Sequence, residues 1–109
     1  MAEPFVVFVT AGSAAEAERI ARALVEEELA ACVNLLSPIR SIYRWEGKVE
    51  QSDEVLLVAK TTAESFERLR ARVVELHSYE CPEVVGWSIE KGHEPYLRWI
   101  EASVRPAGD

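Results

Sequence analysis

The sequence predicts an α+β domain whose strands and helices follow the order βαββαβ, with one further helix at the end of the chain. Three observations lead to this class. Two strand-helix-strand patterns follow one another along 109 residues, the two halves meet in an unusually long hairpin, and no linker separates them. We therefore expect a single domain that spans residues 1–109.

The first half begins with a strand expected at 5–10 and a helix expected at 14–29. The strand is an unbroken run of β-branched and other apolar residues, which is typical of a central strand buried on both faces. Ser13, followed by Glu16 three residues later, predicts a capping box at the start of the helix. The helix presents one apolar stripe, formed by Ala17, Ile20, Ala21 and Leu24.

Strand-like residues resume at 31–36, where the helical stripe has ended. Pro38 then requires either the edge of a sheet or a kink, because proline has no amide hydrogen for the ladder. Residues 39–45 alternate between two faces, and the alternation places Tyr43 and Trp45 on the same face.

A long hairpin follows, with its turn at Glu46 and Gly47 and its returning strand at 48–60. Gly47 is expected to supply the positive φ of the turn. The returning strand is polar near the turn and apolar further on, so its base belongs to the core and its tip is an arm. The rest of so small a domain cannot cover both arms, so we expect the tip aromatics to be exposed unless another chain buries them.

The second half repeats the pattern of the first. Thr61 and Glu64 predict a second capping box, a loop is expected at 77–82, a strand at 83–89 and a short helix at 95–103. The helix after the capping box has a stripe with spacings of 3, 4 and 3, formed by Phe66, Leu69, Val73 and Leu76.

Such a chain is expected to fold as a ferredoxin-like sandwich. In each half two parallel strands would be joined by a right-handed crossover, with a strand of the other half between them. The result is one four-stranded antiparallel sheet with two helices on one face. The last helix lies outside this plan.

Composition limits the classes of function. The chain carries 19 acidic and 12 basic residues, a formal net charge of −7, which argues against nucleic acid or an anionic membrane as partner. The start of the chain lacks the basic and apolar pattern of a secretory leader, so we expect a cytoplasmic location. Two cysteines form no disulfide framework and are expected to be free thiols.

The segment 77–83 holds the densest group of reactive side chains. His77, Glu80, Cys81 and Glu83 are a plausible ligand set for copper or zinc, although their spacing matches no standard zinc motif. The alternative is a loop in which His77 acts as a cation at the C-terminus of a helix and Cys81 packs inward.

Other polar residues also leave alternatives open. Cys32 is expected to be a buried, inert thiol, and Asn34 either lies at an edge or cleft or is a satisfied core amide. The tip of the hairpin fits a subunit interface better than a ligand site, although both need the same residue types, here Tyr43, Arg44 and Trp45. No nucleophile elbow or catalytic dyad is present, so we do not expect an enzyme.

Several motifs occur in a fixed order over nearly the whole chain. They are 29–34, Tyr43-Arg44-Trp45-Glu46-Gly47-Lys48, Lys60-Thr61, His77-Ser78-Tyr79-Glu80-Cys81-Pro82-Glu83 and 96–100. In this order they resemble the CutA divalent-cation tolerance proteins. The resemblance implies a ferredoxin-like subunit in a homotrimer, tolerance of copper and other divalent cations, and metal binding in some members. It also implies a shape similar to the trimeric PII-type signalling proteins, with ligand clefts between subunits.

Two departures from the family pattern concern the metal site. The usual His-Pro-Tyr-Glu is His77-Ser78-Tyr79-Glu80 here, and Cys81 replaces an apolar residue. Some members use a cysteine for copper at the position of Val9, so copper binding by that arrangement is not expected in this chain.

We therefore predict a homotrimer that binds copper, another divalent cation or a small ligand at clefts between subunits, with no cofactor required. The residues expected at these clefts and interfaces are Cys32, Asn34, Tyr43, Arg44, Trp45, Lys60 and Tyr79. One alternative is a PII-like signalling module without a metal role. Another is a small enzyme that uses Cys32, His77 or Glu83.

Overall fold

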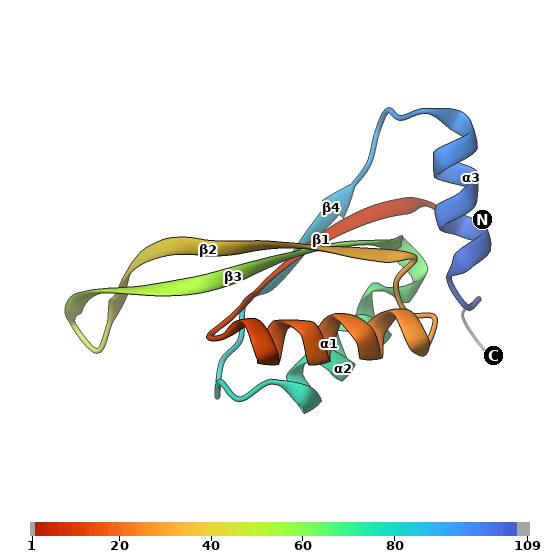
Figure 1. Cartoon of the computed structure of the whole chain (residues 1–109). Coiled ribbons are helices and arrows are strands. Elements are labelled where there is room, and N and C mark those ends of the chain that lie inside the picture. Colours follow the sequence, from red (N-terminus) through yellow and green to blue (C-terminus); the bar gives the residue numbers. More distant parts are fainter. Residues whose placement is uncertain (1, 107–109) are drawn as a thin grey trace.

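The computed structural model describes residues 2–106. Figure 1 shows a twisted sheet with two helices, α1 and α2, against one face and α3 on the other side near one end. No helix in this part of the chain is long and apolar enough to cross a membrane. The elements are β1 (Pro4–Ala11), α1 (Ala14–Glu26), β2 (Cys32–Trp45), β3 (Lys48–Thr62), a 3₁₀ turn η1 (Ala63–Ser65), α2 (Phe66–Leu76), β4 (Val84–Ser88) and α3 (Glu94–Ser103).

The four strands lie in the order β2-β3-β1-β4, and every neighbouring pair is antiparallel. β1 and β2 are therefore parallel with β3 between them, and β3 and β4 are parallel with β1 between them. The predicted α+β class and the antiparallel four-stranded sheet are confirmed. The sheet leaves β2 and β4 as its two outer strands.

The main core lies between the sheet and the two helices. Val7 and Val9 of β1 are fully buried against α1 and α2, and Leu57 of β3 joins them. The predicted stripe of α1 faces this layer, as do Leu69 and Val73 of α2. Apolar periodicity thus located the core side of each helix correctly.

The other face of the sheet is covered only in part. We call it the open face and define it by Val6, Phe8, Leu36, Leu56, Val58, Val85 and Trp87, which are half-buried or exposed. α3 covers one end of the domain through a small separate cluster around Ile100. The prediction that β1 is buried on both faces is therefore wrong for a single chain, because its second face has no helix layer.

The hairpin of β2 and β3 extends beyond the rest of the domain (Figure 1). With the hairpin included, the described chain measures 43 × 27 × 23 Å. Trp45 near its tip is 55% exposed, as the sequence predicted for an isolated chain. Glu46 and Gly47 both have positive φ at the turn. Pro38 lies on the outer strand β2 at a break in register, which confirms the prediction of an edge or a kink.

Helix α1 ends three residues earlier than predicted. Glu28 takes a positive φ, and the amides of Leu29 and Ala30 both donate to the carbonyl of Leu24. This arrangement satisfies a carbonyl at the helix end in the way a glycine-terminated helix does. No glycine is present here to indicate the end from the sequence.

Of the two predicted capping boxes, the first forms one of its two hydrogen bonds and the second does not form. The hydroxyl of Ser13 accepts a hydrogen bond from the amide of Glu16 at 3.2 Å, as predicted. The second box is wrong, because Thr61 is the penultimate residue of β3 and is fully buried. Its hydroxyl donates to the carbonyl of Leu29 at 2.7 Å, and Glu64 instead accepts from the amide of Glu3.

The hydrogen bond from Thr61 to Leu29 ties β3 to the segment that follows α1. We expect Thr61→Val to lower the free energy of unfolding by about 1–3 kcal/mol, because it keeps the shape but leaves a buried carbonyl without its donor. Urea unfolding measures this change. Thr10→Val is the matched control: Thr10 is buried too, but its hydroxyl makes no hydrogen bond within residues 2–106. Equal losses in both variants would contradict the prediction.

Candidate functional site

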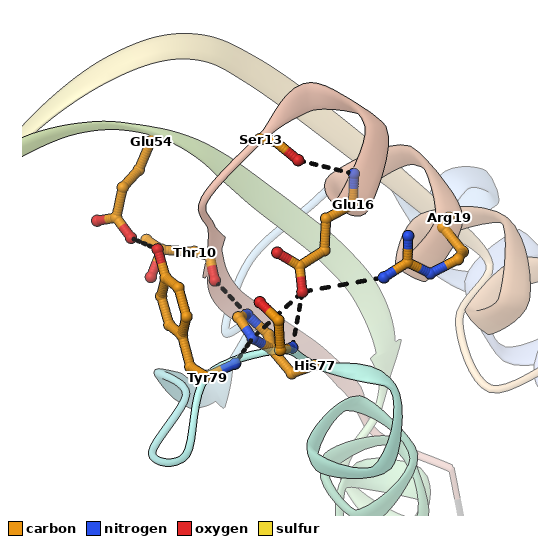
Figure 2. Close-up of polar contacts among 8 residues, drawn as sticks. Thr10, Ser13, Glu16, Arg19, Glu54, His77 and Tyr79 are labelled. Atoms are coloured by element: carbon orange, nitrogen blue, oxygen red, sulfur yellow. Dashed lines mark hydrogen bonds and ion pairs between the residues drawn. The ribbon is translucent and has the colours of Figure 1, made fainter.

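A polar network lies where the end of β1, the start of α1 and the loop after α2 meet (Figure 2), and its members are buried except for Tyr79, which is 37% exposed. We define this polar network by Thr10, Glu16, Glu54, His77 and Tyr79. Figure 2 shows their side chains and the carbonyl of Thr10 turned towards one another from four different elements and loops. It is the only place in the described chain where a buried histidine meets buried carboxylates.

His77 is the centre of the polar network. It follows the last turn of α2, and its side chain is 0% exposed. Nε2 lies 2.7 Å from the carbonyl oxygen of Thr10, and Nδ1 lies 3.1 Å from the amide nitrogen of Tyr79. A carbonyl can only accept and an amide can only donate, so Nε2 carries the proton and Nδ1 offers the lone pair. Both ring nitrogens are therefore used within the chain.

Glu16 connects α1 to the same loop. Its carboxylate accepts from the amide of Ser78 at 2.7 Å and lies 3.7 Å from Nδ1 of His77. Burial, the largest single influence, acts to raise the pKa of Glu16. The hydrogen bonds from Ser78 and Gly12 act in the opposite direction and hold that pKa below its ordinary value of 4.5.

Tyr79 connects the loop to β3. Its hydroxyl donates to Glu54 at 2.7 Å, and its ring packs against that of His77 with centroids 4.6 Å apart. Burial, followed by the hydrogen bond to Glu54, raises the pKa of Tyr79 to about 12. A Cβ at Gly12 would lie 3.0 Å from the Tyr79 hydroxyl, so the absence of a side chain there gives the ring room.

The structure does not bring the four predicted metal ligands together. His77 turns inward and is saturated by hydrogen bonds, whereas Glu80, Cys81 and Glu83 are exposed. Within residues 2–106, no three His, Cys, Asp or Glu side chains are placed to hold a metal ion. The alternative of an inward-packed Cys81 is wrong, because Cys81 is exposed. The His77 ring, expected there as a cation at the end of the helix, instead bonds to Thr10 and to the amide of Tyr79.

Three of the predicted cleft residues do meet, at the start of β2. Cys32 lies opposite Lys60 on β3, and the Lys60 ammonium donates to the side-chain oxygen of Asn34. The thiol of Cys32 is 3.9 Å from that same oxygen and 3.9 Å from the hydroxyl of Tyr96 on α3. Asn34 is exposed on the outer strand β2. It therefore lies at an edge and is not a core amide, which were the two alternatives that the sequence left open.

Neither Cys32 nor Cys81 is in a disulfide, as predicted, and Cys32 is half-buried rather than fully buried. Tyr43, Arg44 and Trp45 are exposed near the tip of the hairpin. The only side-chain hydrogen bond of this group within the described chain joins the hydroxyls of Tyr43 and Ser52 at 3.4 Å.

Sequence reasoning missed three residues of these sites. Glu16 was read only as a capping residue, and neither Glu54 nor Tyr96 was given a role in a site. The one available signal was Glu16 itself, which stands next to the apolar stripe of α1 and is buried with it.

The position of Glu16 predicts a change in the pH dependence of stability. A lowered pKa stabilises the fold above the ordinary value of 4.5, and this contribution is lost as pH falls through the lower folded pKa. We expect Glu16→Gln to lower the free energy of unfolding by about 1–3 kcal/mol at neutral pH. The difference from the unmodified chain should shrink as pH falls through the lowered pKa of Glu16 in the folded chain, because both variants then carry an uncharged side chain.

Urea unfolding at a series of pH values measures this difference. Glu18→Gln is the matched control, because Glu18 lies on the same helix but pairs with Arg22 at the surface. A constant deficit for Glu16→Gln over the whole pH range would show that the lost charge is not responsible.

The sequence and the fold were compared with known proteins. Residues 5–103 match the family model described as "CutA1 divalent ion tolerance protein". A relative from Thermus thermophilus named "Divalent-cation tolerance protein CutA" is 48% identical over 87% of this chain and 92% of its own length.

Solved structures agree with this match. One from Archaeoglobus fulgidus, titled as the periplasmic divalent cation tolerance protein CutA, has a TM-score of 0.90 and 42% identity and covers 94% of this chain and 99% of its own. CutA1 from Oryza sativa has a TM-score of 0.94 and 38% identity, with 96% of both chains covered. The identity over most of the chain and the shared fold support one conclusion: this chain belongs to the CutA1 divalent ion tolerance family.

Proposed function

We propose that this protein acts in tolerance of divalent cations as a homotrimer of ferredoxin-like subunits, and that it binds copper, another divalent cation or a small ligand where subunits meet. The observation that carries the assembly is the open face of the sheet. The function itself is supported by membership of a family named for divalent ion tolerance.

The open face is too apolar for a surface that stays in water. Val85 and Trp87 on β4 are 48% and 49% exposed, and the Trp87 ring packs on Phe8 with centroids 4.9 Å apart. α3 adds two further exposed aromatics, Tyr96 and Trp99. A continuous patch of this kind in an otherwise polar, acidic protein is typical of a subunit interface.

The outer strands favour a closed ring of subunits. β2 and β4 each present an unpaired edge in the single chain, and the hairpin extends the edge of β2 beyond the domain. Exposed edges of this length invite open-ended pairing unless another subunit covers them. Cyclic symmetry covers each edge and buries the hairpin aromatics without producing fibres.

A metal ion would need ligands from more than one subunit. Glu80, Cys81 and Glu83 are exposed on one loop and supply a thiolate and carboxylates, a set that suits copper or zinc. His77 holds this loop against β1, and it could ligate only after releasing Thr10 or the amide of Tyr79. We therefore assign His77 a positioning role in the proposed site.

The proposed function is binding rather than catalysis, and the proposed location is the cytoplasm. No enzyme motif was found in the sequence. The net charge of −7 agrees with a cation as partner better than with a nucleic acid or an anionic membrane.

The homotrimer predicts a mass of about three times the 12.2 kDa of one chain in sedimentation equilibrium at micromolar concentration. Val85→Glu should shift the protein to smaller species, because it places an unpaired charge in the buried interface. Val25→Glu is the matched control: the same substitution at a residue that is 41% exposed on α1, on the other side of the sheet. A monomeric or dimeric unmodified chain, or equal behaviour of both variants, would refute this assembly.

The metal proposal predicts saturable binding of Zn²⁺ or Cu²⁺ to the assembled protein in calorimetric titration. Cys81→Ser and Glu83→Gln should each weaken binding about tenfold or more, because each removes one proposed ligand from a site to which this loop supplies only a few. Affinity should decrease as the pH is lowered, since thiol and carboxyl ligands must lose their protons to bind.

Glu90→Gln is the control for this titration, because Glu90 is exposed outside the loop and should leave the affinity unchanged. Titrations without saturable binding, or with identical affinities in all three variants, would remove the metal from the proposal. The PII-like signalling module would then be the better reading of the same trimer.

A further inference from the structure

We propose that a cavity beside the end of α1 binds the phosphate group of a small aliphatic molecule. The cavity has a volume of about 500 Å³ and lies between the last residues of α1, one side of α2 and the segment that follows α3. We call it the arginine cavity, because Arg68, Arg72 and Arg105 line it. It lies in the helix layer, across the sheet from the open face.

The charges around the arginine cavity do not cancel. Arg72 pairs with Glu27 at 2.9 Å and with Glu75 at 2.7 Å, so these three side chains together carry one negative charge. Arg68 and Arg105 add two positive charges, and neither forms an ion pair with a carboxylate among residues 2–106. The site therefore carries a net charge of +1 (−1 + 2), in a protein whose total is −7.

The two arginines also hold unused donors. Nε and Nη1 of Arg68 and Nε of Arg105 are buried and have no hydrogen-bond partner in the described chain. Buried polar atoms are almost always satisfied, and charged donors most of all. Hydrogen bonds from Arg72 and, less strongly, the charge of Arg105 hold the pKa of Glu27 below its ordinary value. Glu27 thus attracts Arg105 electrostatically but accepts no hydrogen bond from it.

Hydrogen bonds hold the guanidinium group of Arg68 against the backbone of Arg105. Nη2 of Arg68 donates to the carbonyl of Arg105 at 2.7 Å and to the hydroxyl of Ser65 at 2.7 Å. The amide of Arg105 donates to the carbonyl of Glu28 at 2.8 Å, which fixes this segment against the end of α1. Both hydrogens of the Arg68 Nη2 group are therefore used, so the donors left for an anion are Nε and Nη1 of Arg68, each acting singly, and the guanidinium group of Arg105.

The chemistry of the lining selects the ligand. Guanidinium groups donate charge-assisted hydrogen bonds to phosphate oxygens. Arg105, whose side chain makes no hydrogen bond within the described chain, can donate two of them at once, and Arg68 can add single ones. The volume falls within the range of small-molecule sites and exceeds what inorganic phosphate alone would fill. Leu29, Ala71 and Val74 provide an aliphatic wall, whereas the lining has no aromatic ring on which a nucleobase would stack. A phosphate ester with a short aliphatic body fits both parts.

Calorimetric titration of the full chain at constant ionic strength, with chloride as the balancing anion, tests this proposal. Three probes separate the parts of the ligand: inorganic phosphate, glycerol 3-phosphate and glycerol. We expect saturable binding of both phosphates, tighter binding of glycerol 3-phosphate and none of glycerol. No saturable binding of either phosphate up to about 10 mM would overturn the proposal, since weaker binding is not distinguishable from ionic strength effects.

Substitutions locate the binding to the cavity. Arg68→Gln and Arg105→Gln should each weaken binding of glycerol 3-phosphate about tenfold, because each removes a charged donor pair. Arg70→Gln is the matched control, with the same loss of charge on α2 at an exposed residue paired to Glu67. Arg105→Gln decides the question if Arg68→Gln does not fold, because the Arg105 side chain makes no hydrogen bond within the described chain. Equal affinities of Arg105→Gln and Arg70→Gln would overturn the assignment.

Discussion

The structure depends on one constraint: the two long helices of this short chain cover only one face of its sheet. α1 and α2 bury Val7, Val9 and Leu57, and they form the main core. The opposite face keeps Phe8 and Trp87 in partial contact with water. Hydrophobic burial is the dominant favourable contribution to folding and association alike, so the uncovered face is a surface for assembly.

The polar network closes one end of the sandwich and explains why His77 differs from a metal ligand. A buried imidazole is stable only when both nitrogens have partners, and His77 finds them in Thr10 and Tyr79. Glu16 and Glu54 continue the network to α1 and β3. Such a fully satisfied network fixes the loop, and the loop then carries Cys81 at the surface.

Two surfaces of the molecule thus have different chemistry. The open face is apolar and, together with the hairpin, fits other copies of the chain. The arginine cavity lies on the helix side, is positively charged locally and fits an anion. The sheet lies between the open face and helices α1 and α2, and α3 connects the two surfaces, because its aromatics add to the apolar patch and Arg105 follows it in the chain.

The sequence by itself determined the order of the elements, the apolar side of α1 and α2, the long hairpin and the need for an edge or a kink at Pro38, because these follow from periodicity and from local backbone chemistry. It failed where a side chain has a choice of distant partners. Thr61 has the pattern of a helix cap but bonds to Leu29, and His77 has the pattern of a surface ligand but turns inward. Which polar groups meet across the core depends on strand register and packing, and only the tertiary structure decides that.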